Sequence, residues 1–240
     1  RYDPKDPISI NEPPQDYRAT LRDGVKGVRI GVPVDDWIWK EWVTEEHEDR
    51  VRHAIKLLEQ LGAYVVEVSL PLAVDSRALM DGIEPEGLWW DEHSHLFENI
   101  GQWDELRAMI EVGKSKQLDA GDYAEKARRR LLVRQELVAA FKEVDIIAMP
   151  TGMTLGDSPG LKTTMLRGRE VITRSRAMYL NALASITGFP ALSVPCGFAM
   201  GDRLPVGLQL MGRTMEESLI YRVAYAYEQS TEWHLRHPNV

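Results

Sequence analysis

A strand, a helix and a second strand follow one another near the start of this sequence with almost no chain between them. Residues 26–34, KGVRIGVPV, are a short β-branched run of the kind found in strands. Residues 44–61 repeat apolar side chains at helical spacing, and Gly62 suits the left-handed position that commonly ends a helix. Residues 63–70 follow at once as another strand. Joints this short require a right-handed crossover between parallel strands, so the sequence predicts an α/β fold.

The first predicted helix has a clear beginning and a clear apolar face. Thr44 can cap its N-terminus, and the acidic residues that follow favour the positive end of the helix dipole. The expected inner face comprises Val51, Ala54, Ile55, Leu58 and Leu61. We expect His47 and His53 to lie on the exposed side of this helix or near it.

The rest of the chain alternates helices and strands that extend the same sheet. The predicted elements are a long helix over 122–142, a buried strand over 144–149, a helix over 173–186, antiparallel strands over 191–194 and 206–211, and a last helix opened by a capping box over 214–217. We expect Leu131, Leu132 and Val138 to line the buried side of the long helix. Residues 151–169 read as a loop long enough for a functional role. Together these elements indicate a mixed β-sheet flanked by helices.

The beginning of the chain differs from the rest in composition. Residues 1–25 are rich in proline, which predicts an extended surface connector, and the folded domain is expected over 26–240. The chain opens without Met and without an apolar signal core. Such a start is expected for the middle of a longer protein.

Charge and cysteine content exclude several classes of partner. Lys and Arg total 29 against 37 acidic residues, and a formal net charge of -8 argues against a nucleic-acid partner. No apolar run approaches the roughly 18 residues that cross a bilayer, so no membrane partner is expected. Cys196 is the single cysteine, which excludes an internal disulfide and favours a reduced, cytoplasmic compartment. We expect Cys196 to be buried and inert.

Two neighbouring stretches carry a resemblance to a known family. Residues 187–198, TGFPALSVPCGF, and residues 204–213, LPVGLQLMGR, resemble the C-terminal part of amidase-signature hydrolases. Residues 145–151, DIIAMPT, look like the strand of that family that runs into a pocket loop. The resemblance covers essentially the whole chain and implies the C-terminal half of the amidase-signature fold. It also implies an amide hydrolase with a serine nucleophile, a second serine beside a cis peptide bond and a lysine base, with no cofactor and no metal.

The catalytic signature that the resemblance implies is missing from these residues. In the family it is a segment rich in glycine and serine with paired serines, and this sequence contains neither a Ser-Ser nor a Gly-Gly pair. We therefore carry over no catalytic residue and expect this chain alone to be inactive. The N-terminal catalytic half of the same protein is the expected partner, together with a small-molecule amide substrate. Uncovered sheet edges in such a fragment also favour self-association into a homo-oligomer.

Four residues are candidates for substrate binding. In the branch of the family that supplies ammonia for glutaminyl- or asparaginyl-tRNA, an arginine and an aspartate hold the glutamine substrate. The matching positions here are Met109 and Met178, which are uncharged, whereas a free amino acid needs charged partners when it leaves water. The resemblance therefore implies a neutral carboxamide as substrate. Thr151 and Met153 begin the pocket loop and are further candidates, and ordinary packing is an equal alternative for all four.

Other readings of the sequence stay open. One alternative is that the chain belongs to the tRNA branch, as the amide-cleaving subunit of a glutamyl-tRNA amidotransferase, because a small shift of the alignment would let Arg107 or Arg176 supply charge. Alternatively, it is a non-catalytic binding or scaffold protein derived from an amidase. His93 and His95 suggest a metal site, but residues two apart on a helix do not face each other, so no metal is expected.

Overall fold

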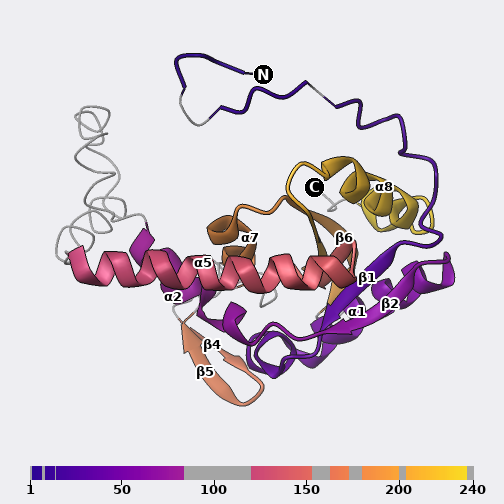
Figure 1. Ribbon diagram of the computed structural model, residues 1–240. Helices are drawn as coiled ribbons and strands as arrows, with labels where there is room; N and C mark the ends of the chain where they lie inside the picture. Colours follow the sequence, from indigo (N-terminus) through magenta and orange to yellow (C-terminus); the bar gives the residue numbers. More distant parts are fainter. Residues whose placement is uncertain are drawn as a thin grey trace, which may run out of the picture.

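Figure 1 presents the computed structural model of this chain, in which a mixed sheet carries helices around it. The structure describes residues 2–6, 9–13, 15–83, 120–152, 163–172, 180–199 and 204–236. The histidines at 93 and 95 lie outside the described residues, and so does the first part of the helix predicted over 173–186.

The central sheet has five strands in the order β2-β1-β3-β7-β6. Their bounds are β1 Arg29–Pro33, β2 Tyr64–Val68, β3 Ile146–Pro150, β6 Ala191–Ala199 and β7 Leu204–Gly212. β1 pairs in parallel with both β2 and β3, whereas β7 runs antiparallel to β3 and to β6. The predicted mixed sheet is therefore confirmed, and so is the parallel strand–helix–strand unit at its start.

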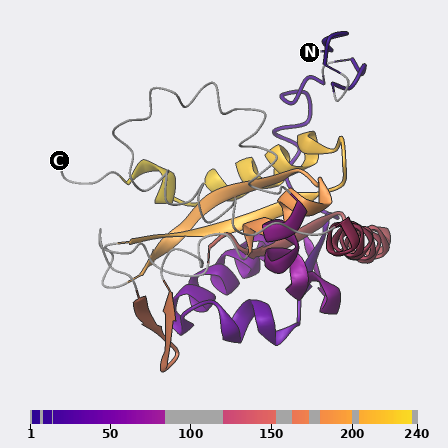
Figure 2. The ribbon, with the colours of Figure 1, turned by 90° about the vertical axis from the view of Figure 1, so that its left-hand side faces the viewer.

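Helices and a second, two-stranded sheet surround this core. The helices are α1 Glu45–Gln60, α2 Ser76–Ile83, α5 Ala120–Glu143, α7 Asn181–Thr187 and α8 Glu217–Glu228, with the short helices η1 Trp37–Glu41, η2 Pro71–Asp75 and η4 Trp233–Leu235. β4 Thr163–Leu166 and β5 Arg169–Ile172 pair as an antiparallel hairpin that projects from the body in both views (Figures 1 and 2). This hairpin corrects the prediction of a continuous loop over 151–169, since four-residue strands with no clear alternation leave little sequence signal.

α1 and α8 cover the same face of the central sheet. A Cβ atom added at Gly197 would come within 3.0 Å of Arg50 on α1, and one at Gly212 would come within 2.8 Å of Ile220 on α8. Gly197 pairs with Val206, which lies an even number of residues from Gly212 along β7. Side chains alternate between the faces of a strand, so both glycines let a helix approach from the same side.

α1 confirms its predicted start and corrects one of its histidines. Thr44 Oγ1 accepts a hydrogen bond from His47 N at 3.1 Å, as the cap prediction requires. His53 is exposed, but His47 is only 2% exposed, because it lies one helical turn before the buried Val51 on the inner face. Burial lowers the pKa of His47 to about 4, so this imidazole is neutral near pH 7.

α5 buries a different face from the one predicted. Val133, Leu137 and Phe141 are its buried residues, whereas Leu131, Leu132 and Val138 are 53%, 37% and 45% exposed. The error arises because this helix has apolar residues on more than one side, so helical spacing alone does not choose between them. Glu136 adds a polar contact from the buried side, accepting hydrogen bonds from Leu72 N and Ala73 N at the start of η2.

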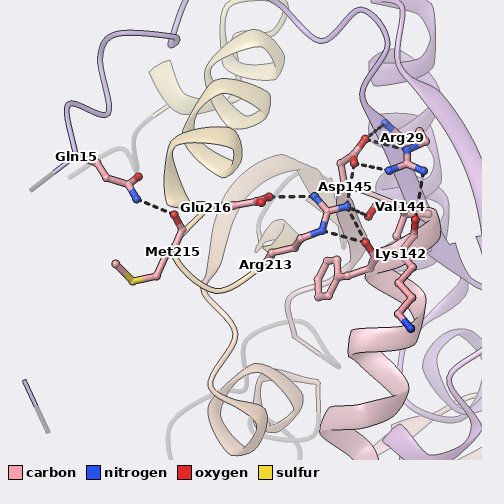
Figure 3. Close-up of polar contacts among 9 residues, drawn as sticks. Gln15, Arg29, Lys142, Val144, Asp145, Arg213, Met215 and Glu216 are labelled. Carbon is pink, nitrogen blue, oxygen red and sulfur yellow. Dashed lines mark hydrogen bonds and ion pairs between the residues drawn. The ribbon is translucent and has the colours of Figure 1, made fainter. Parts of the chain in front are cut away.

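The start of α8 also differs from the prediction. Glu216 occupies the N-cap position without a side-chain cap, and the helix begins at Glu217, so the predicted capping box over 214–217 is wrong. Met215 adopts a positive φ of 65°, which turns the chain sharply before the helix. Its carbonyl accepts a hydrogen bond from Gln15 Nε2 at 2.7 Å, which attaches the N-terminal segment to this turn (Figure 3).

The N-terminal segment has no helix or strand among its described residues, and Figure 1 shows it as an extended trace that leaves the body. It meets the folded part at Tyr17, whose ring lies 5.3 Å from that of Tyr221 on α8. The proposed boundary between a connector over 1–25 and a domain over 26–240 stays a prediction.

Asp145 joins three parts of the fold at the entrance to β3. Its carboxylate accepts hydrogen bonds from Arg29 N at 2.9 Å, from Arg29 Nη2 at 2.8 Å and from Arg213 Nη2 at 3.1 Å (Figure 3). Arg213 also donates to Phe141 O and Val144 O, both at 2.7 Å, which satisfies carbonyls left free at the end of α5. One carboxylate and two guanidinium groups therefore hold β1, β3 and α5 to the chain that follows β7.

The protonation of Asp145 reflects this environment. Burial by itself favours the neutral acid, but the hydrogen bonds from Arg29 and Arg213 outweigh it and lower the pKa of Asp145 from 3.8 to about 2. A carboxyl group with a lowered pKa in the folded state stabilises the fold above its ordinary pKa. That contribution is lost as the pH falls toward the folded-state value.

We predict that Asp145→Asn lowers the free energy of unfolding by about 2 kcal/mol at pH 7, because charged hydrogen bonds to two arginines are lost. The difference from the wild type should shrink as the pH falls from about 4 toward 2, where Asp145 itself becomes protonated. Urea denaturation at several pH values measures both effects. Asp16→Asn, which removes only an exposed ion pair with Arg18, is the matched control. Equal stability of wild type and Asp145→Asn at pH 7 would contradict the assignment.

Candidate functional site

The carboxyl ends of three parallel strands meet at one edge of the central sheet. β1, β2 and β3 run in the same direction and are neighbours, so Val34, Ser69 and Thr151 each follow a strand at this edge. Ligands of α/β proteins bind preferentially outside the carboxyl ends of parallel strands. Thr151 is also the one predicted substrate-binding residue that the structure describes, which makes its surroundings the candidate site.

Thr151 is held by contacts to both strands of the β6–β7 hairpin. Its backbone N–H donates to Gly207 O on β7 at 2.9 Å. Its Oγ1 lies 2.7 Å from Ser193 Oγ on β6, and either hydroxyl can be the donor. Ser193 is exposed and Thr151 is partly buried, so this pair of hydroxyl groups is accessible from one side.

Gly207 makes the hydroxyl pair possible. A Cβ atom at this position would lie 2.8 Å from Ser193 Oγ and 2.9 Å from Thr151 Oγ1, closer than a Cβ atom approaches other heavy atoms in proteins. Any residue with a side chain would therefore push the two hydroxyls apart. The glycine of the LPVGLQLMG stretch is needed here for space beside the strand.

Gln209 extends the polar row along the same face. It pairs in register with Ser193 on β6 and with Met149 on β3, and residues paired in this way share one face of the sheet. The Gln209 side chain is only 4% exposed, and its buried Nε2 has no hydrogen-bond partner among the residues that the structure describes. A buried donor without an acceptor costs free energy, so Gln209 provides a hydrogen bond that the described part of the chain leaves unused.

The arrangement suits binding of a neutral polar group. Thr151 and Ser193 each offer a donor and acceptor oxygen, and neither carries charge. Within the part of the chain that the structure describes, neither hydroxyl is hydrogen-bonded to a lysine, a histidine or a carboxylate. A serine or threonine hydroxyl is a weak nucleophile without such a base, so the described residues leave these two groups able to orient a ligand and do not activate them to attack it.

The other three predicted site residues are not among those that the structure describes. Met109, Met153 and Met178 lie outside the described residues, so their role as an apolar wall of the pocket stays a prediction. The sequence did not single out Ser193, Gly207 or Gln209. The available signal was Gln209, a polar residue inside an otherwise apolar strand, because such a residue in a central strand needs a partner on its own face.

Cys196 is buried as expected. It is 3% exposed, and burial raises the pKa of its thiol to about 12 although the nearby Arg50 acts in the opposite direction. The thiolate needed for nucleophilic chemistry is therefore scarce near pH 7. Among the described residues, no group of three or more His, Cys, Asp or Glu side chains is arranged to hold a metal ion. No helix in the described ranges is both long and apolar enough to cross a membrane.

Comparison with known sequences relates most of the chain to one family. Residues 1–221 match the family model described as Amidase. A glutamyl-tRNA(Gln) amidotransferase subunit from Cyanothece sp. is 34% identical, with 100% of this chain and 53% of that protein covered. The subunit of the same name from Chloroflexus aggregans is 35% identical, with 100% and 52% covered. The chain thus spans about half the length of the curated relatives it matches.

Solved structures give the same picture of the fold. A bacterial aryl acylamidase of the amidase signature family superposes with a TM-score of 0.79 at 21% identity, over 98% of this chain and 49% of that one. The corresponding glutamyl-tRNA(Gln) amidotransferase subunit from Thermotoga maritima superposes with a TM-score of 0.70 at 28% identity, over 96% and 48%. The predicted fold class is therefore confirmed.

We predict that Gly207→Ala destabilises the protein by about 1 to 3 kcal/mol, because the new methyl group must displace Thr151 and Ser193. Thermal denaturation of the purified chain measures the loss. Gly152→Ala is the control from the adjoining segment, since a Cβ atom there meets nothing within 4 Å. Equal melting temperatures for the two variants would show that the hydroxyl pair tolerates the methyl group.

Proposed function

The chain belongs to the amidase family, and we propose that it forms the substrate-pocket part of an enzyme that hydrolyses the carbon–nitrogen bond of a neutral carboxamide. The products would be the carboxylic acid and an amine or ammonia. The observation that carries this proposal is the uncharged pair of hydroxyls, Thr151 and Ser193, at the carboxyl end of β3. A primary or secondary amide presents a carbonyl acceptor and one or two N–H donors, and this pair can satisfy either kind of group.

Catalysis itself is assigned to another part of the full-length protein. Neither hydroxyl of the pair has a base beside it among the described residues, and the chain corresponds to about half of its relatives. We expect the other half to supply the nucleophile and base, as the family resemblance implies, and to cover the exposed side of β6. Met109, Met153 and Met178 would add an apolar wall that favours aryl or alkyl amides over charged ones.

A second function is supported by the curated relatives. The two proteins named above are both subunits of glutamyl-tRNA(Gln) amidotransferases, with identities of 34% and 35%. On this alternative the full-length protein would release ammonia from glutamine and work with partner subunits. The uncharged residues at positions 109 and 178 favour the neutral amide, because the α-carboxylate and α-amino groups of glutamine need charged partners when they are desolvated.

We predict that the chain alone hydrolyses no amide and that the full-length protein containing it hydrolyses neutral aryl or alkyl amides in preference to glutamine. Release of the amine or ammonia from a substrate panel measures both. Preference for glutamine would replace the first function by the second. Hydrolysis by the chain alone would overturn the assignment of catalysis to the other half, and no hydrolysis by the full-length protein would favour a non-catalytic binding role.

Thr151→Val in the full-length protein should lower kcat/KM for a neutral amide by about two- to tenfold, the effect of one neutral hydrogen bond. Valine has nearly the shape of threonine but cannot bind the amide or Ser193 by a hydrogen bond. Thr151→Ser keeps the hydroxyl and is the matched control, expected to stay near the wild-type value. Equal kcat/KM for the wild type and Thr151→Val would exclude Thr151 from substrate binding.

A further inference from the structure

We propose that Arg167 is a positioning residue, which ties the tip of the β4–β5 hairpin to the segment after β1 and thereby anchors the hairpin at the sheet edge that carries the candidate site. This inference rests on the proposed amidase function, because it concerns the same pocket. It is carried by the turn geometry of the hairpin, by the contacts of one guanidinium group and by the place of the hairpin between Thr151 and α7.

The turn of the hairpin uses an unusual residue. Leu166 pairs with Arg169, so Arg167 and Gly168 alone connect the two strands. Both have positive φ angles, 45° for Arg167 and 78° for Gly168, as a two-residue hairpin turn of the primed type requires. Asn or Gly normally occupies the first of these positions, because side chains such as arginine are strained there. The backbone conformation of the turn therefore does not explain why arginine stands here, so the explanation must come from its side-chain contacts.

The guanidinium group of Arg167 bridges the end of η1 and the start of α1. Its Nε donates to Val43 O at 2.8 Å, and its Nη2 donates to Trp39 O at 3.0 Å and to Glu48 Oε2 at 2.7 Å. The Arg167 side chain is only 22% exposed, so these bonds are largely shielded from water. Such a planar fork of donors is a property of arginine that lysine lacks.

The receiving side of this contact is itself held in place. η1 is a single-turn π-helix whose last carbonyls have no partner within the helix, and Arg169 Nη2 binds another of them, Glu41 O, at 2.7 Å. Trp39 Nε1 donates to Pro33 O at 2.6 Å at the end of β1. Arg52 lies over the ring of Trp39 and forms an ion pair with Glu48 at 2.8 Å. The hairpin therefore docks on residues that are themselves held in place.

These docking residues lie at the same sheet edge as the candidate site. η1 follows β1, whose carboxyl end adjoins that of β3, and Thr151 follows β3. Along the chain, the hairpin separates Thr151 and residues 153–162 from residues 173–179 and α7. Met153 and Met178, the predicted apolar wall, belong to these two flanking segments. Arg167 therefore anchors the hairpin at the edge of the sheet where Thr151 lies.

The deciding comparison is Arg167→Asn in the full-length protein. Asparagine accepts the positive φ of the turn, so this variant removes the guanidinium contacts and keeps the hairpin geometry. Arg167→Lys keeps the charge beside Glu48 but loses the fork and should show an intermediate effect. Arg18→Lys makes the same chemical change at an exposed arginine whose partner is the nearby Asp16, and it should behave as the wild type.

Two measurements separate anchoring of the hairpin from positioning of the pocket. Amide hydrogen exchange of residues 163–172 should become about tenfold faster in Arg167→Asn, because the hairpin then opens without unfolding of the sheet. In steady-state kinetics with neutral amides, KM should rise about tenfold while kcat changes by less than about twofold, since substrate contacts are lost and the catalytic groups are not.

Each outcome decides one part of the inference. Unchanged exchange in Arg167→Asn would overturn the anchoring role. If exchange becomes faster while KM is unchanged, Arg167 is a structural contact without influence on the pocket. An equal fall of kcat in all variants would lead to the same conclusion. If the wild-type full-length protein hydrolyses none of the amides, the proposed function fails, and hydrogen exchange still decides whether Arg167 holds the hairpin.

Discussion

The ion-paired carboxylate of Asp145 is the constraint on which the central sheet depends. β3 is the strand where the parallel and antiparallel parts of the sheet meet, since it pairs with β1 on one side and with β7 on the other. Asp145 stands at its entrance and binds Arg29 beside β1 and Arg213 after β7. Arg213 also donates to Phe141 O at the end of α5. Strand order, strand direction and the position of the longest described helix are thus tied to one group of charges.

The opposite end of β3 is built from groups without charge. Thr151 and Ser193 share a hydrogen bond above Gly207, and Gln209 adds a buried amide on the same face. The contrast fits the proposed function: a strongly paired end fixes the strand, and an uncharged end leaves room for a neutral ligand. Arg167 is charged and docks near this edge, but its guanidinium group donates to backbone carbonyls and to Glu48.

Sequence patterns predicted the sheet well and the outer surfaces poorly. The β1–α1–β2 unit, the cap at Thr44 and the antiparallel pair β6–β7 follow from local patterns that physical constraints make nearly unambiguous. His47 and the inner face of α5 depend on which side of a helix meets the sheet, which spacing does not decide. Within the candidate site, the family motif predicts Thr151, whose role stays a prediction. Ser193 and Gln209 reach it through strand register, which joins residues distant in sequence and leaves no local signal.

The separation along the chain of the residues that meet at β3 has a consequence for biosynthesis. Asp145 lies 116 residues after Arg29 and 68 residues before Arg213, whereas β1, α1 and β2 are adjacent in sequence. At the usual rate of about 5 to 20 residues per second, the ribosome needs on the order of 4 to 16 s between the end of β2 at Val68 and the end of β3 at Pro150. During that interval the strand–helix–strand unit exists without β3, the partner of β1 on its second edge. The nascent chain therefore presents an unpaired β1 edge to chaperones well before its central strand arrives.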